Sequence, residues 1–195
     1  DDMLPLAIWD WVYRDVQFEA LLAMNTLYRF TKVWRVMGNL PASGNPYWKK
    51  DGPFKHYADH AIHAFSTLVE KFSWFFPPGW KDMRIHTHVC QAGTKLSYHV
   101  DHHGHGALTY YPHKHWGCTW GGEQFIPNTP KHEGKVPISW HTNYENEKLG
   151  IGLGTYIAPK PNRCVLTAPG VWHAVNRVDP DAGEAVRISI VGFLI

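Results

Sequence analysis

The spacing of apolar residues changes at Trp80, and this change constrains the fold more than any other feature of the sequence. Upstream, apolar residues recur every three to four positions from about Phe54 to Phe76, as on one face of a helix, until the Pro-Pro-Gly segment at 77–79 ends the pattern. Downstream, apolar and polar residues alternate in short segments bounded by turn residues, which is the period of a strand. The sequence therefore predicts a helical first part and a β second part.

Residues 1–80 are predicted to supply helices rather than a separate domain. One helix is expected to begin near Asp15, a residue type favoured at helix N-termini. A second is expected over 54–76, and the Pro- and Gly-rich segment 38–53 between them is expected to be a loop. With 195 residues and 44% hydrophobic content, the chain fits a single domain, 1–195, that can bury a core.

Short strands are predicted from residue 81 to the C-terminus, and no helical pattern separates them. They favour an antiparallel double-sheet barrel or jelly roll, so the predicted fold class is mostly β (α+β), with helices of 1–80 buttressing a jelly-roll core at 81–195. The long polar segment 127–152 is predicted to be an insertion between strands that is mobile or lid-like. The predicted strands are 83–91, 96–100, 107–111, 123–126, 153–158, 163–167, 171–177 and 184–193.

Charge and composition limit the partners. The net charge is +2, from 19 Lys and Arg against 17 Asp and Glu, and no basic run concentrates it, so nucleic acid is not expected. No apolar run is long enough to cross a membrane, and residues 1–5 lack the features of a signal peptide. Cys90, Cys118 and Cys164 are widely separated and form no Cys-x-x-Cys pair, so neither a disulfide framework nor a thiolate zinc site is expected. We therefore expect a soluble protein of the reducing cytoplasm.

Histidine, with 14 residues, raises the expectation of a metal site. His99 and Asp101 are two positions apart, so on an extended strand they project from the same face. His173 follows a Pro-Gly turn and begins another predicted strand, where it offers a third ligand. Two histidines and one carboxylate form the facial triad that binds Fe(II) and leaves positions open for other ligands.

Arg187 and Ser189 share one face of a strand whose other face is apolar. A guanidinium offers a planar fork to a carboxylate, and a hydroxyl adds a donor, so the pair suits the distal carboxylate of a dicarboxylic co-substrate. The other interpretation is a surface pair on an edge strand. The upstream histidines favour the first interpretation.

The sequence resembles the Fe(II)- and 2-oxoglutarate-dependent dioxygenases, and among them the prolyl 4-hydroxylase-like branch, from about Ile85 to the C-terminus. The resemblance implies a double-stranded β-helix core, iron at the positions of His99, Asp101 and His173, and 2-oxoglutarate at the position of Arg187. Its motifs are Tyr98-His99-Val100-Asp101, Ala107 to Tyr111 followed by Trp120-Gly121-Gly122-Glu123, Pro159 to Arg163 before Pro169-Gly170, His173, and Arg187-x-Ser189.

In that branch a tyrosine on the strand after the H-x-D motif also contacts the co-substrate, and here it is Tyr111 or Tyr110. A regular strand favours Tyr111, because its face-mates Thr109 and Ala107 are small enough to line a cavity, whereas a bulge would exchange the two tyrosines. The 14 residues from His173 to Arg187 and the insertion at 127–152 depart from the pattern of the branch.

The implied function is an oxygenase that uses Fe(II), 2-oxoglutarate and O2 to hydroxylate an unactivated C–H bond. Its substrate is expected to be a prolyl or other peptidyl residue, a free amino acid or another small molecule. The alternative is a cupin-like metal- or sugar-binding β-sandwich, although Glu123 lies too far from His113 and His115 for the usual cupin pattern. His86 and His88 are interpreted as satisfied residues of a strand face.

Overall fold

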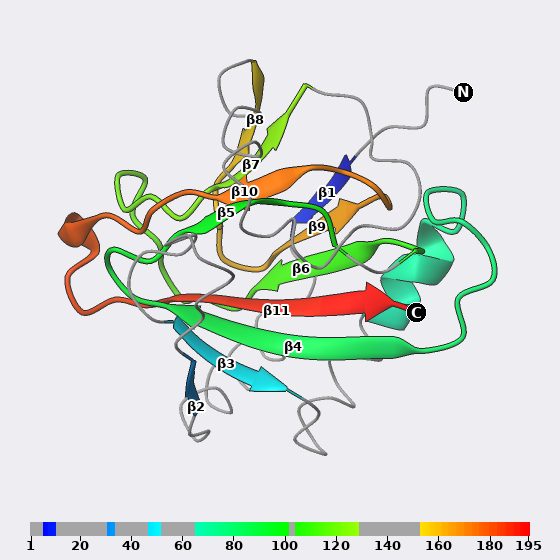
Figure 1. Ribbon diagram of the computed structural model, residues 1–195, viewed down its shortest axis with the longest axis horizontal. Coiled ribbons are helices and arrows are strands. Elements are labelled where there is room, and N and C mark those ends of the chain that lie inside the picture. Colours follow the sequence, from blue (N-terminus) through cyan, green and yellow to red (C-terminus); the bar gives the residue numbers. More distant parts are fainter. Residues whose placement is uncertain (1–5, 11–30, 34–46, 52–64, 102–103, 129–152) are drawn as a thin grey trace.

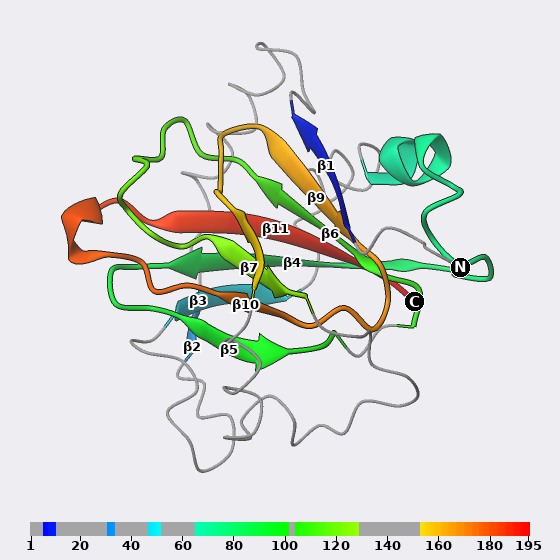
Figure 2. The ribbon, with the colours of Figure 1, turned by 90° about the horizontal axis from the view of Figure 1, so that it is seen from above.

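The computed structural model describes residues 6–10, 31–33, 47–51, 65–101, 104–128 and 153–195, which form two antiparallel sheets in layers (Figures 1 and 2). In this described part the larger sheet has seven strands in the order β1-β9-β6-β11-β4-β3-β2, and the smaller has four in the order β5-β10-β7-β8. The strands are β1 (Leu6–Asp10), β2 (Thr31–Val33), β3 (Tyr47–Asp51), β4 (Met83–Cys90), β5 (Leu96–His99), β6 (Ala107–Tyr111), β7 (Gln124–Pro127), β8 (Gly154–Ile157), β9 (Arg163–Thr167), β10 (His173–Val175) and β11 (Arg187–Leu194).

One face of the larger sheet packs on a helix at residues 65–71 and on the turns that follow it. Phe65 of this helix lies against Gly192 of β11, where a side chain would collide with its ring. Burying a side chain of Leu or Phe size stabilises the fold by about 1.5–3 kcal/mol, so this core holds β4, β6, β9 and β11 together. Its buried members include Phe65, Leu68, Val69, Met83, Ile85, Leu108, Tyr110, Cys164, Leu166, Ile190 and Leu194.

The opposite face of the larger sheet is turned toward the smaller sheet. Strand alternation places Arg187 and Ser189 of β11 and Tyr111 of β6 on this face, away from the helix. The Tyr111 hydroxyl donates to Gln124 Oε1 of β7 across the two layers, at 3.5 Å. Three of the four predicted site residues of the larger sheet therefore lie on this inner face.

All the strands predicted after Trp80 are present, with ends that differ by up to three residues from the prediction. The long segment between His173 and Arg187 contains a 3-10 helix at Pro180–Ala182, and the side chain of its N-terminal Asp179 accepts the Asp181 N–H at 2.9 Å. The jelly-roll core of the β part is confirmed.

The predicted organisation of residues 1–80 was wrong in part. The supposed loop at 38–53 contains β3, and β1 and β2 are further strands in a region predicted to be helical. β3 pairs with β4 and β1 pairs with β9, so they extend the larger sheet at both sides. Short strands such as these form because a strand distant in sequence offers unpaired backbone N–H and C=O groups. The local spacing of apolar residues does not reveal such a partner.

Three predictions fall wholly or partly outside the described residues. The helix beginning near Asp15 and the segment 129–152 of the predicted lid lie there, and both stay predictions. Of the helix predicted over 54–76, the described part is helical at 65–71 and continues in turns. Among the described residues, no helix has the length and apolar character needed to cross a lipid bilayer.

Replacing Gly192 by Ala should destabilise the fold. The added Cβ would lie 2.7 Å from Phe65 Cδ2 and 3.0 Å from Met83 Sδ, so the buried Phe65 ring would have to shift. We expect the free energy of unfolding to fall by about 1–3 kcal/mol in urea denaturation. Gly104→Ala is the matched control, because a Cβ there meets nothing within 4 Å. Equal stability of the two variants would contradict this account of the core.

Candidate active site

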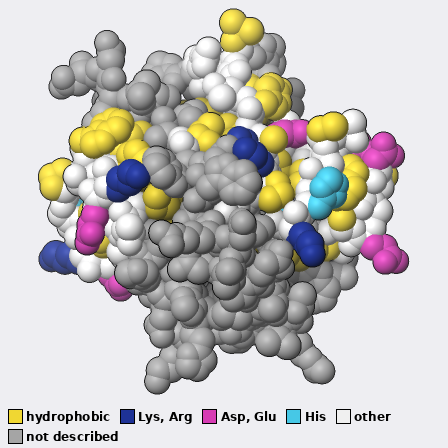
Figure 3. All heavy atoms as spheres, turned by 180° about the vertical axis from the view of Figure 1, so that it is seen from behind, with side chains coloured by type: hydrophobic (Ala, Val, Ile, Leu, Met, Phe, Trp, Pro, Cys, Tyr) yellow, Lys and Arg dark blue, Asp and Glu magenta, His cyan; other side chains and the backbone are white. Residues whose placement is uncertain are grey.

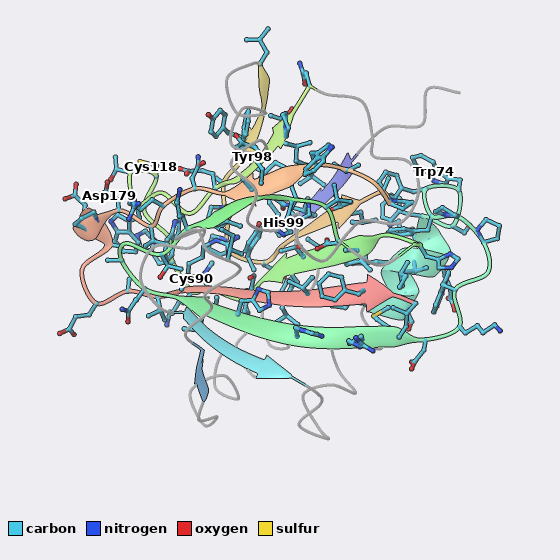
Figure 4. All side chains as sticks on the ribbon, in the orientation of Figure 1. Trp74, Cys90, Tyr98, His99, Cys118 and Asp179 are labelled. Atoms are coloured by element: carbon cyan, nitrogen blue, oxygen red, sulfur yellow. The ribbon has the colours of Figure 1, made fainter. Side chains whose placement is uncertain are left out.

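Three predicted metal ligands meet on the smaller sheet. His99 ends β5 and His173 begins β10, and the two are direct cross-strand partners with ring centroids 4.3 Å apart. Asp101 places Oδ1 3.9 Å from His99 Nε2 and Oδ2 3.6 Å from His173 Nε2. His99 lies on the side of β5 that faces β6 and β11 (Figure 4). The ligand atoms all lie within 4.8 Å of one another, and the described residues contain no other such group.

The backbone orients one of these ligands. His173 Nδ1 donates to the Val171 carbonyl at 3.1 Å, and this bond directs Nε2 toward Asp101. Two neutral imidazole nitrogens and one carboxylate oxygen are the donor set of the facial triad. The residues present therefore fit Fe(II), because they would occupy one face of the ion and leave the other face open.

The guanidinium of Arg187 is buried on the larger sheet. Its Nε donates to the Gly122 carbonyl at 2.7 Å, Nη1 to Ser189 Oγ at 3.3 Å and Nη2 to Tyr111 Oη at 3.3 Å. Arg187 and Ser189 each expose 2% of their surface, and β11 lies between β4 and β6. The interpretation of this pair as a surface feature of an edge strand was therefore wrong.

Arg187 has no acidic partner in the described part of the chain, where no carboxylate lies within 4.0 Å of its nitrogens. Its described contacts are with neutral groups, which include two hydroxyls, a carbonyl, the Cys90 thiol and the Tyr111 ring, whose centroid lies 5.1 Å from the guanidinium carbon. Cys90 is its cross-strand partner on β4, and burial raises the pKa of that thiol although the Arg187 charge opposes the rise. A buried cation with only neutral neighbours is a favourable place for an anion.

The two neighbouring tyrosines have separate partners. Tyr111 points to the inner face and contacts Arg187, whereas the Tyr110 hydroxyl donates to Asn162 Oδ1 at 3.1 Å on the helix side. The ladder between β6 and β9 runs without a register shift, so no bulge exchanges the two. Burial raises the pKa of Tyr111, against the lowering effect of Arg187, so its hydroxyl stays protonated at neutral pH.

Sequence reasoning placed His113 in a turn and gave it no role. In the structure it is 4% exposed, its Nδ1 donates to the Pro159 carbonyl at 3.2 Å, and its Nε2 accepts the Ile188 N–H at 2.6 Å. Burial, together with the Arg187 charge, lowers the pKa of His113 to about 3. The one available signal was its spacing of two from Tyr111, which continues the inner face of β6 beyond Pro112.

His86 and His88 lie on the inner face of β4. The register pairs His88 with Ser189 and His86 with Val191, so both point to the same side as Arg187. Both are half-buried, and the His86 ring meets the Phe193 ring edge-on at 5.3 Å. They thus belong to the layer between the sheets, and no metal-binding group of the described residues includes them.

Figure 3 shows the face opposite to the view of Figure 1. On it, the described Lys and Arg side chains are scattered among acidic and apolar ones and form no continuous basic stripe. A stripe of that kind is the usual electrostatic mark of a phosphate-binding surface.

Comparison with known proteins adds the fold family. No family model matches the sequence, and no curated protein shows significant sequence similarity to it. Similar solved structures nevertheless cover nearly the whole chain. A prolyl 4-hydroxylase from Pseudomonas putida matches with a TM-score of 0.66 and 14% identity, over 97% of this chain and 91% of that chain.

Two further structures carry bound molecules. A prolyl hydroxylase from Trichoplax adhaerens, in complex with a hypoxia inducible factor peptide fragment, matches with a TM-score of 0.65 and 12% identity over 98% of this chain and 83% of that one. HygX from Streptomyces hygroscopicus, with nickel, 2-oxoglutarate and hygromycin B bound, matches with a TM-score of 0.65 and 9% identity over 98% and 82%. The chain therefore has the fold of the 2-oxoglutarate and Fe(II) oxygenases together with a His-Asp-His group, and the resemblance inferred from its motifs is confirmed at the level of fold.

Loss of one ligand should abolish tight metal binding. Loss of a residue that only hydrogen-bonds to a metal ligand lowers metal affinity by about 10–100-fold. For His173→Ala we expect a larger fall in Fe(II) affinity, because a direct ligand is removed. The measurement is anaerobic titration, with circular dichroism to follow the fold. His115→Ala is the control, since His115 is exposed and outside the group. Wild-type affinity in the His173 variant would exclude His173 as a ligand.

The buried imidazole of His113 should make stability depend on pH. Its pKa is about 3 in the folded chain against 6.5 in a free imidazole, so between these values the unfolded chain binds one more proton. The neutral His113 ring contributes fully to the stability of the native state above pH 6.5. Below that pH the free energy of unfolding decreases by about 1.4 kcal/mol for each pH unit. In urea denaturation of wild type and His113→Gln, the difference in unfolding free energy between the two should narrow by about 2 kcal/mol as the pH falls by 1.5 units from 6 to 4.5. Parallel profiles would contradict the assignment.

Proposed function

We propose that this chain is an Fe(II)- and 2-oxoglutarate-dependent hydroxylase. His99, Asp101 and His173 hold the iron, and Arg187 binds the far carboxylate of 2-oxoglutarate with help from the Ser189 and Tyr111 hydroxyls; Tyr110 has no part in the site. One observation carries the proposal above the others: the buried guanidinium of Arg187 lacks a carboxylate among the described residues. A carboxylate brought by a co-substrate would supply it.

The charges of the site balance when the co-substrate is included. Fe(II) with two neutral imidazoles and one carboxylate keeps a single positive charge, and Arg187 adds another. Fully ionised 2-oxoglutarate carries two negative charges, so it neutralises both centres. The near end would meet the open face of the triad, and the far end would meet the planar fork of Arg187, which fixes the orientation of the molecule.

Bound iron would supply the oxidative chemistry, in which 2-oxoglutarate, O2 and a C–H bond become succinate, carbon dioxide and the hydroxylated product. One oxygen atom of O2 enters succinate and the other enters the hydroxylated product. The protein contributes position and environment. Val171 holds the His173 ring with Nε2 toward the ion, and Arg187 and Tyr111 hold the co-substrate away from bulk water. Oxygen-dependent formation of succinate tests the proposal against the cupin-like alternative.

The substrate is proposed to be a peptidyl residue, such as prolyl, or a small molecule such as a free amino acid. The similar structures support both classes, since one holds a peptide fragment and another holds hygromycin B. A binding screen under anaerobic conditions, with prolyl peptides and free amino acids in parallel, separates them. We further infer a location in the reducing cytoplasm, because Cys90, Cys118 and Cys164 are all free thiols.

A carboxylate placed beside Arg187 should compete with the co-substrate. Cys90 faces Arg187 across the strand pair and is close to Asp in size, so Cys90→Asp would pair the guanidinium internally. We expect the Michaelis constant for 2-oxoglutarate to rise by at least tenfold. Arg187→Met should lose about 2–5 kcal/mol of co-substrate binding, with Arg187→Lys intermediate because it keeps the charge and loses the fork.

The matched control is Cys90→Asn, which has the same shape as the Asp variant without its charge. Its Michaelis constant should stay well below that of Cys90→Asp. Anaerobic iron titration should give similar affinities for all these variants, because none alters a triad residue. If the Asp and Asn variants behave alike and Arg187→Met keeps the wild-type constant, Arg187 does not bind the co-substrate.

A further inference from the structure

Arg187 sits at a point where the larger sheet is incomplete. β11 pairs with β4 along its whole length, but its pairing with β6 covers only Ile190 to Phe193. The segment beside Arg187 therefore lacks a backbone partner on the β6 side. The Ile188 N–H, on that side, is taken instead by the Nε2 of His113, at 2.6 Å.

The His113 ring is held in one form by two bonds at its opposite ends. Nδ1 donates to the Pro159 carbonyl, so Nε2 carries the lone pair that accepts the Ile188 N–H. A protonated ring would set an N–H against an N–H at Ile188. The neutral imidazole thus joins the segment after β6, the turn before β9 and the start of β11.

His113 also contacts the other groups that surround the guanidinium. Its ring stacks with Tyr111 at 6.1 Å and with Trp116 at 4.9 Å. Trp116 Nε1 donates to the Gly121 carbonyl at 3.0 Å, and the next carbonyl, of Gly122, accepts from Arg187. Gly122 has φ +72, and a Cβ there would lie 2.8 Å from Arg187 Cδ, so this close approach requires glycine.

We propose that His113 is a positioning residue for co-substrate binding. It fixes Arg187 by two routes: it bonds the neighbouring Ile188 amide, and it stacks on Trp116, which bonds the Gly121-Gly122 backbone that accepts from Arg187. This inference rests on the proposed function, because it assigns His113 to the site that binds 2-oxoglutarate. The contacts described for His113 include neither the triad residues nor the terminal nitrogens of Arg187. Its effect is on the geometry of the fork, and a fork that is free to turn loses the alignment a bidentate contact needs.

Two substitutions of similar polarity separate this role from packing. In His113→Gln the side-chain oxygen can reach the place of Nε2 and accept the Ile188 N–H. In His113→Asn the amide ends near the place of Nδ1 and leaves Ile188 without its acceptor. Packing is reduced in both, so only the positioning role predicts a difference in co-substrate binding between them.

The experiment measures equilibrium binding of 2-oxoglutarate to the Mn(II)-loaded protein by calorimetry without oxygen, and then the kinetic constants of the Fe(II) enzyme. We expect His113→Asn to bind 2-oxoglutarate at least tenfold more weakly than wild type, with metal affinity unchanged, and His113→Gln to stay within about threefold. In turnover the Asn variant should raise the Michaelis constant for 2-oxoglutarate more than it lowers kcat.

The outcomes separate the two proposals. If wild type does not bind 2-oxoglutarate, the proposed function fails. If wild type binds it and Arg187→Met loses it, while His113→Asn binds like wild type or no more weakly than His113→Gln, only the role of His113 is overturned. Should the Asn variant not fold, Trp116→Phe carries the test, since it keeps a stacked ring and removes the donor to Gly121. A loss of about threefold or more in 2-oxoglutarate affinity supports the network, and wild-type affinity overturns it.

Discussion

The buried charge of Arg187 is the constraint on which the arrangement of the site depends. Its Nε, Nη1 and Nη2 donate to Gly122, Ser189 and Tyr111, but these are neutral acceptors, and hydrogen bonding alone does not offset the desolvation of a full charge. The desolvation cost remains because Arg187 lies on a central strand, between β4 and β6, and is not exposed to water. A protein that only needed stability would gain by an apolar residue here, so the arginine indicates an anionic ligand.

The metal group and the arginine belong to different sheets, and this division ties the site to the packing of the whole fold. His99 and His173 are cross-strand partners on β5 and β10, whereas Arg187 and Tyr111 project from the larger sheet. A ligand that spans both is sensitive to the separation of the layers. The Tyr111 to Gln124 bond connects the layers directly, and the core around Phe65 supports the larger sheet from behind. Positioning to the accuracy that catalysis requires therefore depends on residues that never touch the ligand.

The sequence was informative wherever a function depends on spacing within one strand. An alternation with a period of two predicted the later strands. It also predicted that His99 and Asp101 lie side by side, and likewise Arg187 and Ser189. It failed where the cause lies in a distant segment. β3 forms because β4 offers it an edge, and His113 gains its role from Pro159 and Ile188, which no local pattern connects to it. The choice between Tyr110 and Tyr111 needed the observed register, because one bulge would have reversed it.

That register has its own physical cause in a residue of the turn before β9. Asn162 adopts φ +59, a left-handed conformation that Asn tolerates better than most residues. From there its N–H donates to the Tyr111 carbonyl at 2.9 Å, and its side chain accepts the Tyr110 hydroxyl. Tyr110 is thereby held on the helix side, and strand alternation turns Tyr111 and, two residues on, His113 toward Arg187. A slip of one residue in β6 would turn both side chains away from the face of the sheet that carries Arg187, so the proposed site depends on which positions of this segment alternate inward.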